Sequence, residues 1–185
     1  MMQRDRRPAL AVSLRVSSRP VLIVGSGPAA QERTSRLRAA GATTRLVAPV
    51  DYETEMCADV FLVVAHSDDT ALDRRIAADA RSAGALAYAH DQPDVSDLVF
   101  PALARRGPLS LAVTTDGVAP ALARRIREEV ERLLDEAGPS LDALIEDLAR
   151  ARAQESAGAA RAERLYRLAC RLSFAGRLAV ETTGH

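Results

Sequence analysis

The stretch that decides the fold is PVLIVGSGPAA, residues 20–30. Residues 21–24 are continuously apolar and rich in β-branched side chains, the pattern of a parallel strand buried on both faces. A Gly-x-Gly-x-x-Ala turn follows, directly before a helical pattern at 29–40. Such a turn lets backbone N–H groups approach a pyrophosphate at the helix N-terminus. The stretch therefore predicts either a dinucleotide-binding loop or a tight corner that needs glycine only for packing.

The composition narrows the class of protein. The chain has 185 residues, enough for one domain with an appendage or for two small domains. Its 25 acidic residues balance 25 basic ones, all of them arginine, and only 3% of residues are aromatic, so we expect no nucleic-acid partner. The absence of lysine excludes a Schiff base and a Walker-type phosphate loop. Cys57 and Cys170 lie far apart, and no apolar run is long enough for a membrane span, so we expect a cytoplasmic protein with no membrane partner.

Strand and helix patterns alternate through the first hundred residues. We expect strands at 21–24, 43–47, 60–65 and 85–89, and helices at 29–40 and 70–83. A short edge strand is expected at 10–16, where apolar and polar residues alternate. The alternation of strands and helices predicts an α/β fold, a Rossmann-like parallel sheet with right-handed crossovers.

The pattern changes after Phe100. A basic turn at 105–108 is expected to lead into a strand at 109–114. Amphipathic helices are expected at 118–136, at 140–153 and near 159–172, with the first two separated at Gly138. The apolar faces of these helices need a partner, either the first domain or a second copy of the chain.

Ionisable side chains follow two of the predicted strands. His66 and the following residues end one strand, and His90 and Asp91 end the next. Ligands of open parallel sheets gather at the carboxyl ends of the strands, where Asp91 could accept a proton and the histidines could bind a metal ion or move protons. The alternative is a set of solvated loop histidines and helix-capping carboxylates. The end of the second strand lacks the acidic residue that usually holds a nucleotide ribose; only Asp51 lies near.

Several segments together resemble a known family. They are RPVLIVGSGPAA, AGATTRLVAP, FLVVAHSDDTALDRRIAADA and, most specifically, the long run from His90 to Leu134. Taken nearly end to end, the chain resembles the family of precorrin-2 dehydrogenase and sirohydrochlorin ferrochelatase, which is also the N-terminal module of siroheme synthase. Relative to that family the segment 50–59 is short, His66 replaces a small residue, Asp73 replaces asparagine, and Asp116 replaces a small residue.

The resemblance implies an organisation and an activity. It implies a Rossmann-like NAD-binding domain at 1–100, a dimerisation region at 101–138 and a helical C-terminal domain at 139–185. It also implies a homodimer that oxidises the tetrapyrrole precorrin-2 to sirohydrochlorin with NAD, in siroheme biosynthesis, with ferrochelatase activity in bifunctional members.

The resemblance and the residues together assign the site. Asp91 is the expected acid–base group. The expected cofactor-binding residues are Gly25, Ser26, Gly27, Pro28, Ala29, Pro49, Val50 and Ser67, and the expected substrate-binding residues are Thr114, Thr115, Arg105 and Arg124, the arginines because substrate carboxylates need cations.

Two alternatives stay open. One is a chelatase or metal-binding relative without dehydrogenase activity, which would hold ferrous iron or another divalent metal with His66, His90 and Asp91. The other is a non-catalytic dimeric scaffold or sensor that keeps the fold.

Overall fold

The protein divides into two compact units. The computed structural model describes residues 10–173. The first unit runs to Pro101 and also includes Thr114–Pro120, and the second comprises Ala102–Val113 and the chain from Ala121 onward. The break at Pro101 lies next to the predicted end of the nucleotide domain, whereas the predicted division at 138 stays a prediction.

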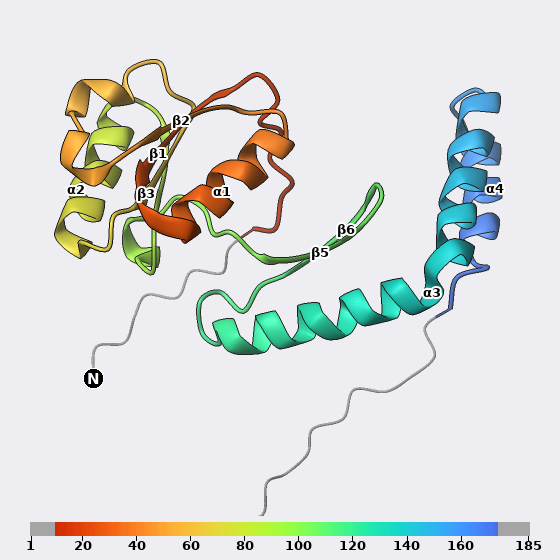
Figure 1. Cartoon of the computed structure of the whole chain (residues 1–185). Coiled ribbons are helices and arrows are strands. Elements are labelled where there is room, and N and C mark those ends of the chain that lie inside the picture. Colours follow the sequence, from red (N-terminus) through yellow and green to blue (C-terminus); the bar gives the residue numbers. More distant parts are fainter. Residues whose placement is uncertain (1–9, 174–185) are drawn as a thin grey trace, which may run out of the picture. The chain divides into compact units, whose positions relative to one another are not determined.

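A four-stranded parallel sheet forms the centre of the first unit (Figure 1). Its strands, in the order β2-β1-β3-β4, are β1 (Pro20–Gly25), β2 (Thr43–Val47), β3 (Leu62–His66) and β4 (Leu86–Ala89). The crossover helices are α1 (Gly27–Ala39) and α2 (Thr70–Ser82). The predicted Rossmann-like α/β fold is confirmed, and the order places the carboxyl ends of β1, β3 and β4 side by side.

Two hydrophobic clusters lie on opposite faces of this sheet. Leu22 and Val24 of β1 pack into the cluster that includes Ile76 of α2, whereas Val21 and Ile23 pack into the cluster that includes Leu37 of α1. Successive strand residues therefore point to alternate faces, and each face is covered by one helix. This double burial explains why the strands have continuous apolar sequences.

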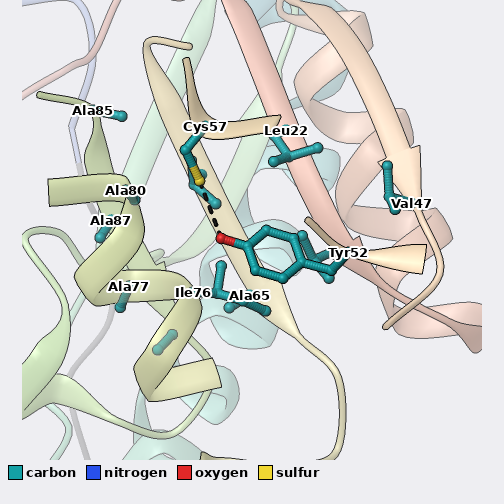
Figure 2. Close-up of a cluster of buried hydrophobic side chains, with 13 residues drawn as sticks. Leu22, Val47, Tyr52, Cys57, Ala65, Ile76, Ala77, Ala80, Ala85 and Ala87 are labelled. Carbon is teal, nitrogen blue, oxygen red and sulfur yellow. Dashed lines mark hydrogen bonds between the residues drawn. The ribbon is translucent and has the colours of Figure 1, made fainter. Parts of the chain in front are cut away.

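The short connection between β2 and β3 is tied into the core. It holds two 3₁₀ turns, η1 (Pro49–Asp51) and η2 (Thr54–Cys57), and no further strand, so β2 is the edge of the sheet. Figure 2 shows Tyr52 and Cys57 within the cluster that α2 covers. The Tyr52 hydroxyl lies 3.3 Å from the Cys57 Sγ and donates to Asp79 Oδ2 over 3.0 Å. Burial, more than these bonds, raises the pKa of Tyr52, and it also raises that of Cys57, so both stay protonated at neutral pH.

The second unit is a hairpin and two helices. Strands β5 (Ala102–Arg106) and β6 (Leu109–Val113) pair antiparallel. Helix α3 (Pro120–Gln154) is kinked at Gly138, whose φ is +40°, and α4 (Ala159–Ala169) follows. The kink lies where the sequence predicted a break between two helices, and it precedes Pro139, which cannot donate a helical hydrogen bond. No helix within residues 10–173 has the length and apolarity that crossing a membrane requires.

Two sequence-based predictions of local structure are wrong. Residues 10–16 form no strand, and their apolar side chains Leu10 and Val12 are exposed, so the alternating pattern has no sheet to join. Arg105 and Arg106 belong to β5 rather than to a turn, which is formed by Gly107 and Pro108. Arg106 donates two hydrogen bonds to Asp142, over 2.9 and 2.6 Å, which gives this basic residue a structural partner within the second unit.

Candidate nucleotide and acid–base site

Gly25 is required by packing. It ends β1 and pairs with His66 of the neighbouring strand β3. A Cβ atom at this position would lie 2.5 Å from the His66 carbonyl oxygen and 3.0 Å from the Ala30 Cβ. Both neighbours are close to rigid backbone, so no other residue fits without moving the strand or the helix. At Gly25, the packing interpretation of the loop is therefore sufficient.

Gly27 is different, because packing does not explain it. Its φ is +76°, and a Cβ there would meet nothing within 4 Å. Ser26 is the N-cap of α1 but its side chain makes no capping hydrogen bond, and the first turn of α1 holds no acidic residue. The first-turn N–H groups are thus left for an anion, apart from Pro28, which has none. Open space and uncapped amides fit the pyrophosphate of a dinucleotide.

The predicted ribose-binding residues lie at the edge of the sheet. Pro49 and Val50 are in η1, immediately after β2, and the Val50 side chain is exposed. The carboxylate nearest in sequence, Asp51, is also exposed. A ribose at this edge would therefore meet mainly backbone groups and an apolar side chain.

Asp91 presents an exposed carboxylate from a fixed backbone. It follows β4 with φ of +55°, and its side chain is 91% exposed. The next residue, Gln92, is buried, and its amide donates to the Thr70 carbonyl oxygen over 3.3 Å and accepts from Arg74 over 3.2 Å. These bonds anchor the loop to α2. Sequence reasoning selected Asp91 but missed Gln92, since a polar residue in a loop gives no sign of burial.

His66 and His90 form a stacked pair beside this carboxylate. Their ring centroids are 3.9 Å apart with an angle of 16° between the planes. The His90 Nε2 lies 3.7 Å from Asp91 Oδ2. His66 Nδ1 is buried and has no hydrogen-bond partner within the described residues. Burial, followed by the neighbouring His90 and Arg33, lowers the pKa of His66, so this imidazole is neutral at pH 7.

The predicted metal ligands are neighbours but do not form a metal centre. Stacked imidazoles present their faces to each other, so their nitrogens do not converge on one point with Asp91. Within residues 10–173, no group of three or more histidine, cysteine, aspartate or glutamate side chains is arranged to hold a metal ion. The assignment of His66, His90 and Asp91 as a metal site therefore has no structural support.

Ser67 hydrogen-bonds to a residue in the first turn of helix α2. Its N–H and its hydroxyl both donate to Asp73 Oδ1, over 3.0 and 2.6 Å, and the Asp73 side chain is buried. Asp69 caps the same helix by accepting from the N–H groups of Ala71 and Leu72. Asp69 is therefore a capping residue, as the alternative interpretation of these carboxylates expected, and the Ser67 hydroxyl is already engaged within the protein.

The predicted substrate-binding residues are spread over both units. Thr114 and Thr115 form a turn within the first unit, in which their hydroxyl oxygens accept from the N–H groups of Asp116 and Ala119. Arg105 lies on β5 and Arg124 on α3, both in the second unit. Of the fifteen residues assigned from sequence, the structure brings together those at the carboxyl ends of the neighbouring strands β1, β3 and β4.

A pocket beside the histidine pair was not predicted. Its volume is about 230 Å³, and it is lined by Ala29, Glu32, Arg33, Arg36, His66 and His90. Arg33 and Arg36 belong to the helix predicted at 29–40, and neither was among the predicted site residues. Their spacing could have indicated more, because residues 29, 33 and 36 lie on the same side of a helix that begins at the glycine loop.

Comparison with known proteins gives matches over both units. The family model described as "Putative NAD(P)-binding" matches residues 12–102, and the model described as "Sirohaem biosynthesis protein central" matches residues 106–133. The siroheme synthase of Neisseria meningitidis serogroup C (strain 053442) is 35% identical over 138 residues, 64% of this chain and 29% of that protein. The siroheme synthase of Ectopseudomonas mendocina (strain ymp) is 35% identical over 134 residues, 63% of this chain and 29% of that protein. The chain thus spans about three tenths of these curated relatives.

A solved structure shares the fold. The chain described as SirC, precorrin-2 dehydrogenase, superposes with a TM-score of 0.65 and 22% identity, covering 86% of this chain and 89% of that one. The two family models follow one another in the same chain and together match more than half of it. The chain therefore belongs to the sirohaem biosynthesis family, with a putative NAD(P)-binding domain followed by the family's central region.

Proposed function

We propose that the protein is an NAD-dependent dehydrogenase that oxidises precorrin-2 to sirohydrochlorin in siroheme biosynthesis. The observation that carries the proposal is the open, uncapped start of α1 at Gly27. It lies in the region matched by the NAD(P)-binding family model, and the carboxylate of Asp91 follows a strand of the same sheet. A nucleotide loop and an acid–base group at the carboxyl edge of one parallel sheet are the minimum that such a reaction needs.

In the proposed reaction one C–H bond of the substrate is broken and its electron pair leaves with the hydrogen. Bound NAD supplies the acceptor for that hydride. The N–H groups at the start of α1 would hold the pyrophosphate, and Gly27 would let the phosphates come close to the backbone. Asp91 would take the proton that leaves the substrate as the new double bond forms, and its exposed position makes it accessible to a large ligand.

We further propose that the protein works as a homodimer with residues 101–138 at its interface. The match of residues 106–133 to the family's central region supports this assignment, as do the exposed apolar side chains of Leu122 and Leu133 on α3. Thr114, Thr115, Arg105 and Arg124 are then proposed to contact the tetrapyrrole in the assembled dimer.

The proposal does not extend to metal insertion. The stacked histidines and the lack of a three-ligand group within the described residues give that chemistry no support. The proposed activity is tested by anaerobic incubation of the full chain with precorrin-2 and NAD, recording the absorbance of sirohydrochlorin. Formation of sirohydrochlorin at a rate proportional to protein concentration is expected, and a folded protein that forms none would refute the proposal.

A further inference from the structure

Arg33 is a cation without an acidic partner in the described part of the chain. Its guanidinium lies over the ring of Phe100, 4.1 Å from the centroid, and 5.2 Å from the centroid of Tyr88. Those two rings meet edge to face, with centroids 4.8 Å apart. The neighbouring Arg36 is paired with Glu32, but no ion pair to Arg33 is formed among residues 10–173. Burial lowers the pKa of Arg33, although a guanidinium remains charged at neutral pH.

The guanidinium belongs to the pocket between α1 and the histidine pair. Arg33, His66 and His90 all line this hollow of about 230 Å³. The buried Nδ1 of His66 has no partner in the described chain, which is uncommon for a buried polar atom. A partly buried cation held in place by aromatic rings, with imidazoles around the same space, is an arrangement that favours a bound oxyanion.

From this arrangement we infer that Arg33 is the anchor for a carboxylate side arm of the tetrapyrrole substrate. The inference rests on the proposed function, and it assigns a specificity-determining residue that the glycine loop and Asp91 do not include. A guanidinium offers two parallel N–H donors, which match the two oxygens of a carboxylate. A guanidinium would bind a nucleotide phosphate in the same way. The position of the pocket therefore has to distinguish a substrate carboxylate from a nucleotide phosphate.

The position of the pocket favours the substrate. Amides at the start of α1 already fit the pyrophosphate, and the ribose-binding edge lies at β2. Arg33 instead contacts Tyr88 of β4, on the other side of β1, and shares its pocket with His90, the neighbour of Asp91. A carboxylate held there would fix the substrate on the side of the sheet that carries the proposed acid–base group.

The experiment compares two oxyanion ligands on matched variants of the full chain. Uroporphyrin, a porphyrin polycarboxylate, and NADH are titrated separately by fluorescence into the wild type, Arg33→Gln, Arg33→Lys and Arg38→Gln. The last variant is the control, since Arg38 is an exposed arginine of the same helix whose side chain bonds Thr44. Turnover of precorrin-2 with NAD is measured on the same four proteins.

The expected result is a loss that is specific to the tetrapyrrole. Arg33→Gln should weaken uroporphyrin binding about tenfold or more, because a charged hydrogen-bond partner is lost. It should raise KM for precorrin-2 while kcat stays within about twofold, as for a group that binds ground state and transition state equally. NADH affinity should not change, and Arg38→Gln should match the wild type throughout. Arg33→Lys keeps the charge but not the paired donors, so its affinity for uroporphyrin should lie between those of the wild type and Arg33→Gln. This variant also tests the inference if Arg33→Gln does not fold.

Three results would overturn the inference. The first is that uroporphyrin binds Arg33→Gln and Arg33→Lys as tightly as it binds the wild type. The second is that uroporphyrin does not bind the wild type. The third is that the variants lose NADH affinity and keep uroporphyrin affinity, which would assign the pocket to a nucleotide phosphate. Absence of wild-type turnover is a separate outcome that refutes the proposed function. Normal wild-type turnover, together with Arg33 variants that bind uroporphyrin as the wild type does, refutes this inference alone.

Discussion

At the scale of single residues, the two glycines of one loop have different roles. Gly25 is fixed by the close approach of β1, β3 and α1, whereas Gly27 faces open space with a left-handed backbone. A sequence motif gives both the same weight, because it records only that glycine is present. The backbone geometry separates a packing requirement from an opening that a ligand can occupy.

Substituting each glycine by alanine should separate these roles. Gly25→Ala should prevent correct packing and lower the unfolding temperature strongly, because its Cβ would meet backbone at 2.5 Å. Gly27→Ala should cost only about 1–2 kcal/mol, the penalty of a left-handed backbone for an L-residue, yet weaken NADH binding. Thermal unfolding and NADH titration measure the two effects. A Gly27→Ala protein that binds NADH as the wild type does would remove this loop from the nucleotide site.

Asp91 is predicted to carry the acid–base step. Asp91→Asn should reduce turnover of precorrin-2 by about 10²-fold or more, since an amide cannot take up the proton. Asp59→Asn is the matched control, because Asp59 is also an exposed aspartate with positive φ, 58° against 55°, and lies outside the site. Steady-state kinetics measure both variants, and a fully active Asp91→Asn would transfer the proton step to another group.

His66 should make stability depend on pH. Its pKa is lowered in the folded protein, chiefly by burial, so on acidification the unfolded chain binds the proton first. The contribution of neutral His66 to the free energy of unfolding is complete above the pKa of histidine in the unfolded chain, about 6.5. This contribution is lost as the pH falls through the lowered pKa of the folded protein. Urea unfolding at a series of pH values should show falling stability on acidification, and His66→Gln should reduce that slope. An unchanged slope in the variant would mean that other groups cause it.

At the scale of elements, the connection between β2 and β3 is short and holds two 3₁₀ turns and no strand. Tyr52 and Cys57 insert into the core cluster under α2 (Figure 2). Asp79 of α2 accepts a hydrogen bond from the Tyr52 hydroxyl. The segment thus closes the edge of the domain by side-chain packing, without another strand. The core is therefore complete at this edge of the sheet although the connection is short.

Removing the Tyr52 hydroxyl tests this connection. Tyr52→Phe should lower the free energy of unfolding by about 1 kcal/mol, the usual net value of one hydrogen bond, since Thr54 and Arg75 still contact Asp79. Tyr166→Phe is the matched control because the Tyr166 side chain is 72% exposed. Urea denaturation of the two variants measures the difference, and equal stability would show that the hydroxyl does not anchor the segment.

The regular elements were predictable because their signals are local. The apolar strands β1 and β3 and the capped helix α2 follow from periodicity and N-cap residues in the sequence. Strand β5 was missed because Arg105 and Arg106 resemble a turn until their partner strand is known. The strand predicted at 10–16 failed for the opposite reason, since alternation alone does not supply a partner. Tertiary pairing decides both cases, and sequence periodicity does not record it.

The candidate site was predictable in part for a similar reason. Asp91, His66 and His90 follow directly from the rule that ligands gather at the carboxyl ends of parallel strands. The stacking of the histidines, the buried Gln92 and the aromatic contacts of Arg33 depend on residues far apart in the sequence. These contacts also arrange the three predicted metal ligands differently from a metal site, because the two histidines stack and the Asp91 carboxylate beside them is exposed.

At the scale of the whole molecule, residues 12–102, which match the NAD(P)-binding model, are followed by residues 106–133, which match the model of the central region of sirohaem biosynthesis proteins. The central claim is that the Gly27 loop and Asp91 serve one oxidation. The most direct test is an anaerobic reaction of the full chain with precorrin-2 and NAD in which NADH and sirohydrochlorin are quantified together. Equal molar amounts of the two products are expected at every time point. Sirohydrochlorin formed without NADH, or neither product formed by a folded protein, would contradict it.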